Sequence, residues 1–305
     1  MTERGFALIA VLLVLALMGV VGAEFAFSMR LEASAVRAYK EAIAATHLAE
    51  AAIEQAVREI AADVTYVVVA EDGDLTFYTR ERLAVPRLPR TQVPLGPGLF
   101  SYRISDEEAR LNLNVSSPER MHRLLQDLGL DKNARDVLVD SLMDWRDANE
   151  EHRLNGAESD DYYLKLPVPY RARNANLESV TELLQIRGVT PRLYYGAEGT
   201  PGLADLVTVK TPGQVNINTV SDRVLRAHGF ADAEISEIVQ NRRLGPYQSV
   251  GRFGGRGLSA TTRTFRIEAE GFIDGRVGAR LSAVIQARTE GGAPSVAVLE
   301  WSGSR

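Results

Sequence analysis

The feature that most constrains this chain is an unbroken apolar run from Phe6 to Ala23, which follows the short, partly charged segment 1–5. A helix rises about 1.5 Å per residue, so a helix over this run would measure roughly 27 Å, close to the hydrocarbon thickness of a bilayer. No second apolar run of that length follows. The sequence therefore predicts a single membrane pass over residues 6–23.

The helix is predicted to continue past the membrane. A cleaved secretory signal is the alternative, because Val21-Gly22-Ala23 fits a small-residue cleavage site. Against it, no Gly or Pro occurs between Gly22 and Gly73, and strong helix formers fill residues 24–62. An amphipathic helix over 24–62 carries a stripe of small side chains, which lets another helix or a sheet approach closely. The stripe consists of Ala42, Ala45, Ala49, Ala52 and Ala56.

The leader and the apolar helix together resemble those of type IV prepilins and type II secretion pseudopilins. The resemblance implies that a prepilin peptidase cuts between Gly5 and Phe6, methylates the new amino terminus and leaves the helix in the membrane. The family usually has Glu at the fifth mature position, where this chain has Ala10. An unpaired charge in an apolar filament core is costly, and a subunit at the filament end need not supply one. Lacking this Glu is typical of one minor pseudopilin family, general secretion pathway protein K.

Strand patterns flank a long helical region. Residues 65–70 and 75–79 read as a hairpin around Asp72-Gly73-Asp74, and residues 264–272 and 276–287 alternate around Asp274-Gly275. Prolines at 86, 89, 94 and 97 suggest a surface connection before alternation resumes over 99–105. Between the two groups the pattern is helical, and Ser117-Pro118-Glu119 is a helix start.

The predicted fold class is α+β: a long N-terminal transmembrane and amphipathic helix, with an antiparallel sheet interrupted by a large inserted α-helical domain. The resemblance implies the same plan, since protein K carries a helical insertion in a pseudopilin sheet. The predicted segments are the leader 1–5, the transmembrane helix 6–23, its continuation 24–62, the first part of the sheet 63–110, the inserted domain 111–255, and the last strands with a tail, 256–305.

The strongest chemical signal is an acidic segment over residues 140–163, where eight acidic residues face two arginines. Its net charge of −6 exceeds the −5 of the whole chain, so the acidity is local. Asp147, Asn149 and Glu151 alternate and are followed by Gly156 and Glu158. Oxygen donors at short spacing around a glycine suit Ca²⁺, although the spacing is not that of an EF-hand. A solvated acidic loop is the alternative.

The protein K resemblance favours calcium. That family has a Trp, Asp, acidic or Asn, then Gly-Ala-Glu and Tyr pattern here, and it implies a structural Ca²⁺ whose best ligands are Asp147, Asn149 and Glu158. Asn149 stands where an acidic residue is commoner, which affects the expected affinity. The weaker candidate ligands are Glu150, Glu151, Asp160 and Asp161, and the matching residues are Trp145, Asp147, Asn149, Gly156, Ala157, Glu158 and Tyr163.

A degenerate repeat with an offset of 41 residues lies within 176–253. It pairs Leu183-Leu184 and Gly188-Val189 with Val224-Leu225 and Gly229-Phe230, each as helix, glycine turn and next helix. Such pairs resemble helix-hairpin-helix modules, which hold phosphate with turn amides and basic side chains. Residues 211–253 carry five Arg and four acidic residues, and the turn lacks a second glycine. A packing module is favoured over nucleic-acid binding.

Other motifs point to structure rather than catalysis. The elements Asn112-Leu-Asn114 and Asn216-Ile-Asn218 precede predicted helices, where Asn caps helices or holds turns. The chain contains no His-Glu-x-x-His, Gly-x-Ser-x-Gly or phosphate-loop motif, and its four histidines are scattered. It has no cysteine, which excludes disulfides and thiolate sites. An acid and base pair at Glu150 and Glu151 has no surrounding site, so an enzyme is not expected.

The resemblance implies a minor pseudopilin in the bacterial inner membrane, with its globular part in the periplasm. Its function would be to cap the tip of a type II secretion pseudopilus and to help start its assembly. Implied partners are the prepilin peptidase, the major pseudopilin and two sister minor pseudopilins that contact the long helix and its Ala stripe, together with secreted substrate or the outer-membrane channel. The alternative is a minor pilin of a type IV or DNA-uptake pilus.

Overall fold

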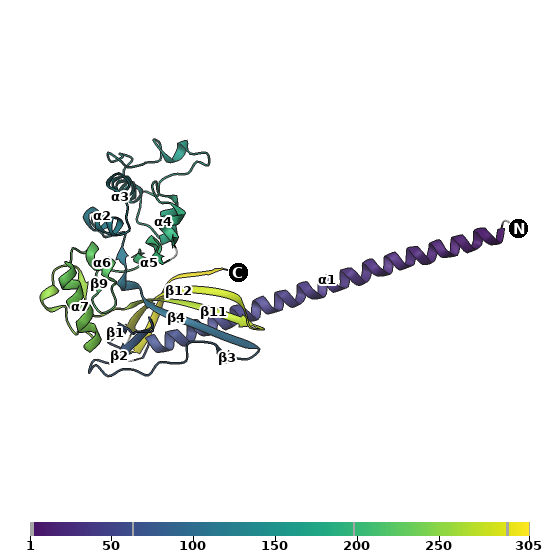
Figure 1. The fold of residues 1–305 in the computed structure, drawn as a ribbon, viewed down its shortest axis with the longest axis horizontal. Helices are drawn as coiled ribbons and strands as arrows, with labels where there is room; N and C mark the ends of the chain where they lie inside the picture. The colour runs from purple at the N-terminus through teal and green to yellow at the C-terminus, as the bar shows by residue number, and fades with distance from the viewer. Residues whose placement is uncertain (1–2, 63, 198, 291–292, 305) are drawn as a thin grey trace.

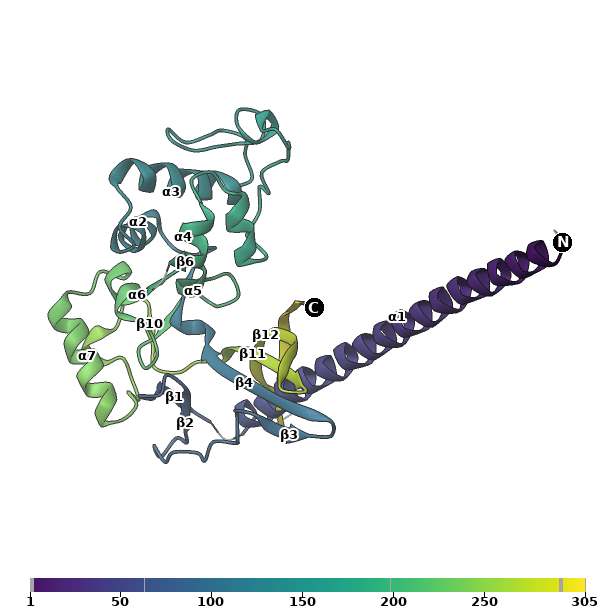
Figure 2. The same ribbon diagram turned by 45° about the vertical axis from the view of Figure 1, so that its right-hand side comes forward.

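The computed structural model describes residues 3–62, 64–197, 199–290 and 293–304. Figure 1 shows one long helix whose N-terminal half projects away from the molecule, a sheet packed on its C-terminal half, and a group of helices beyond the sheet. Figure 2 separates the sheet from these helices more clearly. We call residues 41–110 and 261–304 the sheet lobe, and residues 111–260 the helical lobe.

Helix α1 (Glu3–Ile60) runs without a break through the apolar run and its amphipathic continuation. This confirms the predicted continuation and follows from the absence of Gly and Pro after Gly22. All side chains from 6 to 40 are exposed, and burial begins only where the helix meets the sheet. The projecting half of α1 therefore has no partner within the described chain.

The alanine stripe packs against the chain's own sheet. Ala45, Ala49, Ala52 and Ala56 are fully buried there, whereas Ala42 is exposed. The helix lies so close to β11 that a Cβ atom at Gly271 would lie 1.9 Å from the carbonyl oxygen of Ala45. The expectation that partner subunits use this stripe is therefore wrong for these four residues, because small side chains here serve contact between helix and sheet.

The main sheet has five antiparallel strands in the order β13-β12-β11-β4-β3. Alternate residues of β11, among them Phe265, Ile267 and Ala269, point toward α1 and are buried. The turn at Asp274-Gly275, where both φ angles are positive, joins β11 to β12 as predicted. The strands are β3 (Val93–Leu95), β4 (Gly98–Asp106), β11 (Thr264–Ile273), β12 (Arg276–Glu290) and β13 (Ala293–Ser304).

Two predictions about the first strands need correction. The proline-rich connection is partly a strand, because Val93–Leu95 pairs with β4. Pro94 fits there because β3 is an edge strand, where a missing N–H need not break a ladder. The predicted hairpin forms as β1 (Tyr66–Val69) and β2 (Leu75–Tyr78), but in the described chain it makes its own two-stranded ladder and joins the sheet lobe only through apolar packing.

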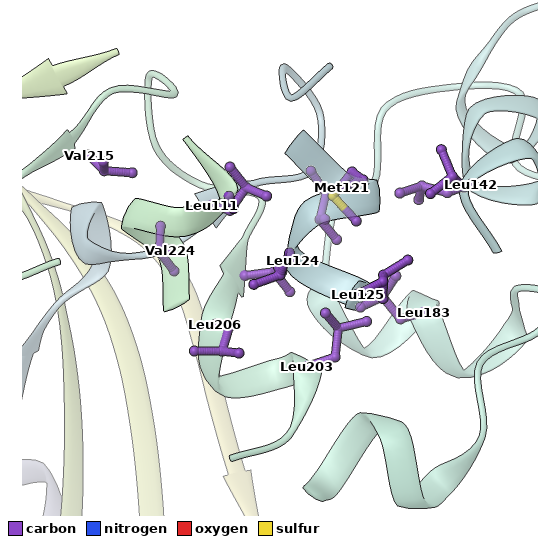
Figure 3. Close-up of a cluster of buried hydrophobic side chains, with 14 of the residues drawn as sticks. Leu111, Met121, Leu124, Leu125, Leu142, Leu183, Leu203, Leu206, Val215 and Val224 are labelled. Carbon is purple, nitrogen blue, oxygen red and sulfur yellow. The ribbon is translucent and has the colours of Figure 1, made fainter. Parts of the chain in front are cut away.

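The helical lobe has its own apolar core (Figure 3), and among the described residues none belongs both to this core and to the core under the sheet. Helix α2 begins as predicted, with Pro118 at its first turn after Ser117. The main elements are β5 (Leu111–Asn112), α2 (Pro118–Asp127), α3 (Lys132–Arg146), β8 (Val207–Thr208), β9 (Val215–Asn216), α6 (Asp222–Ala227), α7 (Asp232–Leu244) and β10 (Leu258–Ser259). The short elements are η1 (Glu107–Ala109) at the junction of the lobes, η2 (Tyr163–Lys165), η3 (Val180–Gln185), α4 (Pro191–Tyr195), β6 (Gly196–Ala197), β7 (Thr200–Pro201), α5 (Leu203–Leu206) and η4 (Gly251–Phe253).

The helical lobe contains a structural repeat that differs from the predicted one. Residues 111–146 and 215–244 each form a two-residue strand, an Asn-x-Asn element, a helix, a glycine turn and a second helix. Gly129 and Gly229 occupy equivalent turns with φ of 87° and 82°. The segment around Gly188 instead forms a 3-10 helix and a five-residue helix. Gly129 is thus the fuller counterpart of Gly229, and α2 packs against α6 across the repeat.

Candidate functional site

The projecting half of α1 is the first candidate site. Within the described ranges, α1 is the one helix long and apolar enough to cross a membrane, with a mean hydropathy of 2.9 in its most apolar window. Phe6 lies near its N-terminus and is 75% exposed, and Ala10 follows one turn later. This helix has the length and composition of a membrane anchor, which agrees with the predicted pass over residues 6–23.

Farther along α1, just before it reaches the sheet, three large apolar side chains are exposed. Val36, Tyr39 and Ile43 are 48%, 68% and 40% exposed. Their spacing of three and four places them on one face of the helix. This face is apolar and lies outside the expected membrane segment, so it is a candidate contact for another subunit.

The acidic loop is the second candidate site, and it begins at the C-terminal end of α3. Asp144 is fully buried there and was not among the predicted ligands. Arg153 Nη1 donates to Asp144 Oδ1 at 2.6 Å and to Asp147 Oδ2 at 2.7 Å, so one guanidinium bridges two carboxylates. Burial raises the pKa of Asp144, while the bonds from Arg153 oppose that rise. Asp144 lies three residues before Asp147, the C-terminal cap of α3, but this spacing does not show that Asp144 meets the loop.

Glu158 is the least satisfied group of the loop. Its side chain is 1% exposed, and within the described residues neither carboxylate oxygen has a hydrogen-bond partner. Burial, followed by repulsion from nearby carboxylates with Asp144 foremost, raises the pKa of Glu158 to about 7. An orphaned buried carboxylate beside other carboxylates is costly unless a cation neutralises it.

The other predicted ligands divide into three pairs. Asp147 and Asn149 fold into consecutive turns, with Asn149 Nδ2 donating to Asp147 Oδ1 at 2.8 Å. Glu150 and Asp161 lie close enough to raise the pKa of Glu158 by repulsion. Glu151 and Asp160 point outward and are exposed, so the structure does not bring them to this cluster.

Buried aromatic side chains and a hydrogen bond from Arg187 hold the acidic loop in place. Trp145 and Tyr163 are fully buried and meet edge to face with their ring centres 5.2 Å apart. Arg187 donates to the carbonyl of Gly156 at 2.9 Å. A Cβ atom at Gly156 would lie 1.8 Å from Asp144 Oδ2, so only glycine lets the loop pass this carboxylate. The loop is therefore held at a fixed distance from α3.

As the side chains stand, no three acidic or histidine groups in the described parts of the chain converge closely enough to share one ion. The guanidinium of Arg153 lies between Asp144 and Asp147, in the position that a cation would take. The oxygen donors and the orphaned Glu158 nevertheless match the chemistry of a hard divalent cation. The residues fit such an ion provided that Arg153 swings away.

The helix-hairpin-helix-like turn at Gly229 is filled by the chain's own groups. Glu234 accepts a hydrogen bond from the backbone N–H of Ala231 at 2.9 Å, and Arg256 donates to the carbonyl of Gly229. Arg256 also pairs with Glu234 at 2.7 Å. A carboxylate therefore stands where a phosphate-binding hairpin would offer free amides. This agrees with the packing interpretation.

Comparison with known proteins adds three findings. A family model described as type II secretion system (T2SS), protein K matches residues 104–198. The putative type II secretion system protein K of Escherichia coli K12 is 26% identical over 79% of this chain and 75% of its own length. Type II secretion system protein K of Pseudomonas aeruginosa is 27% identical over 79% of this chain and 72% of its own.

The fold is also similar to a solved one. A chain from the crystal structure of the GspK-GspI-GspJ complex of the enterotoxigenic Escherichia coli type 2 secretion system superposes with a TM-score of 0.69 and 18% identity. The superposition covers 90% of this chain and 99% of that one. Both the helix on an antiparallel sheet and the helical insertion are shared. The chain is therefore similar in sequence and in fold to type II secretion system protein K over most of its length.

Proposed function

We propose that this chain caps the tip of the type II secretion pseudopilus and helps to start its assembly. The observation that carries the proposal is the position of the helical lobe, which stands at the end of the molecule opposite the projecting half of α1 (Figure 1). A subunit stacked above would meet this lobe. Ala10 supports the same position, because a subunit with no neighbour above it need not supply a carboxylate to that neighbour's amino terminus.

The proposed placement is a single pass through the inner membrane after cleavage between Gly5 and Phe6 by a prepilin peptidase, with both lobes in the periplasm. The proposed partners are the major pseudopilin and two sister minor pseudopilins of the GspI and GspJ kinds, as in the similar solved complex. Because four alanines of the stripe are buried, we assign the contact outside the membrane to the face of Val36, Tyr39 and Ile43.

The chain has no cysteine, so a single cysteine introduced at the exposed Ser236 of α7 can be labelled specifically. Pseudopili assembled with this variant should carry a gold label at one end only, and labels along the shaft would contradict capping.

In the soluble part from residue 30 onward, Val36→Arg with Tyr39→Arg should abolish a ternary complex with the two sister proteins. Ser34→Arg, on the opposite face of α1, should leave that complex intact.

The rival function is a minor pilin of a DNA-uptake pilus. Salt-sensitive binding of DNA by the soluble part, without a ternary complex, would favour it. The hairpin turn blocked by Glu234 argues against that outcome.

We also propose that the acidic loop binds a structural Ca²⁺. The ion would be held by Glu158, Asp147 and Asn149, with Asp144 added and with backbone carbonyls completing the shell. It would neutralise the carboxylates and fix the long loop on α3. The orphaned carboxylate of Glu158 supports the proposal.

The soluble part should melt at a higher temperature with calcium than with chelator, and equal melting would contradict the site. Asp160→Asn, at an exposed position, should keep the full response.

A further inference from the structure

The chain crosses between the two lobes twice, and three consecutive acidic residues lie at the crossing. The outward passage follows β4 through Asp106, Glu107 and Glu108, and the return passage runs from β10 into β11 at Thr264. The three side chains are 3%, 0% and 7% exposed. Consecutive buried carboxylates are costly, so their position calls for a physical reason.

Asp106 joins the helical lobe to the return passage. Its carboxylate accepts from Thr219 Oγ1 at 2.6 Å and from Asn216 Nδ2 at 2.8 Å, both in the helical lobe. It also accepts from Thr262 Oγ1, on the chain returning to the sheet, at 2.7 Å. The second Asn-x-Asn element of the sequence therefore has a partner that lies 110 residues earlier in the chain.

Glu107 makes a second bridge of the same kind. It accepts from Thr208 Oγ1 of the helical lobe at 2.6 Å and from Arg266 of β11 at 2.8 and 2.9 Å. Glu108 accepts from Thr264 Oγ1 at 2.9 Å and from the backbone N–H of Arg263 at 3.0 Å. Each of the first two carboxylates thus contacts both lobes, and the third fixes the start of β11.

Apolar packing does not duplicate these bridges. In the described parts of the chain the two apolar cores share no buried residue, and a cavity of about 220 Å³ lies at the junction, lined in part by Asp106, Leu206 and Val224. A half-buried ion pair between Lys210 and Glu300 also crosses the junction, at 3.7 Å. At that separation it is longer than the hydrogen bonds to Asp106 and Glu107, so it fixes the geometry less closely. The buried hydrogen bonds are therefore the contacts best able to select one angle between the lobes.

We propose that Asp106, Glu107 and Glu108 form an orientation lock, which holds the helical lobe at one angle to the sheet lobe. Hydrogen bonds are directional, so a carboxylate shared by donors from two lobes is satisfied in only one arrangement. Apolar contact alone would tolerate several. This inference concerns the free subunit and does not depend on the proposed capping function.

The experiment measures the distance between spin labels on the two lobes of the soluble part. The labels are placed on cysteines at Glu54 of α1 and Ser236 of α7, both exposed. The test variant combines Thr208→Val with Thr219→Val, which keeps side-chain volume but removes one lobe-to-lobe hydroxyl from each of Glu107 and Asp106. Thr190→Val is the matched control, because its hydroxyl caps α4 within the helical lobe.

The parent and the Thr190→Val control should give one narrow distance distribution. The double variant should give a distribution at least twofold broader, with unchanged far-ultraviolet circular dichroism, and Asp106→Ala should broaden it further. An equally narrow distribution in the double variant and in Asp106→Ala would overturn the lock. Unfolding of the double variant would also overturn it, since the three residues would then be needed for folding itself rather than for orientation.

Discussion

At the scale of single residues, the buried carboxylates of this chain show two ways of tolerating burial. Burial alone would raise the pKa of Glu107, but hydrogen bonds from Arg266 and the charge of Arg110 hold that pKa below its usual range. Among the residues that the structure describes, Glu158 has no such partner, and its pKa rises to about 7. A charge that the fold leaves unpaired indicates a missing counter-charge. This difference separates a structural ion pair from a candidate cation ligand.

The effect of Glu158→Gln on stability should change sign between protein in chelator and protein with excess calcium. In chelator near pH 8 the variant should be more stable than the parent by about 2 kcal/mol, because it no longer buries an unpaired charge. With excess calcium the parent should be the more stable protein, since only it gains the full binding free energy. Melting temperatures under both conditions give the test, and a variant less stable than the parent in both would contradict the role assigned to Glu158.

Asp106 should make the stability of the soluble part fall as pH rises from about 4 to about 6. Burial raises the pKa of Asp106 to about 6, against hydrogen bonds from Thr219, Thr262 and Asn216 that lower it. Over that range the folded state binds more protons than the unfolded state, so ionisation costs up to about 3 kcal/mol. In urea unfolding with saturating calcium, the free energy of unfolding of Asp106→Asn should increase relative to that of the parent as pH rises. A difference that is constant with pH would contradict this.

At the scale of elements, the close contact between α1 and the sheet depends on small residues on both sides. Ala45 lies over Gly271, and the next two turns of the helix present Ala49 and Ala52 to the strands. The sequence identified this stripe, because its spacing shows one narrow helix face. The spacing could not reveal which surface covers it, since a partner helix and the chain's own sheet make the same demand for small residues.

The same substitution at two positions of the stripe separates these cases. Ala49→Leu should destabilise the soluble part by about 3 kcal/mol, because the added atoms have no room against the sheet. Ala42→Leu, at the exposed start of the stripe, should change stability by less than about 0.5 kcal/mol. Urea unfolding measures both, and equal effects would mean that the burial of Ala49 does not govern the packing.

At the scale of the whole molecule, one continuous helix joins the apolar N-terminal run to the two lobes. Helix α1 crosses the proposed cleavage step, the apolar run and the sheet contact without a break. Cleavage after Gly5 would keep all of the apolar run, whereas cleavage after Ala23 would remove it. The processing site therefore decides whether the subunit remains anchored.

Mass spectrometry of the mature protein from membranes should find an N-methylated Phe6 at its amino terminus. A terminus at Met1 or Glu24 would contradict processing as a prepilin. Replacement of Gly5 should block cleavage and leave the leader in place, and replacement of Gly22 should have no effect on the terminus.

Local sequence patterns determined some features of this fold, and tertiary contacts determined others. The long apolar helix, its continuation and the hairpin turns follow from local rules of periodicity and turn chemistry, so the sequence by itself determined them. The sequence also indicated the acidic loop, but it missed Asp144, since only the folded loop shows that Gly156 passes against this carboxylate. The true repeat partner of Gly229 and the strand at Pro94 likewise emerged from the fold. The junction of the lobes was decided by tertiary structure alone, because Asp106 meets donors more than a hundred residues away, and no local pattern records contacts of that range.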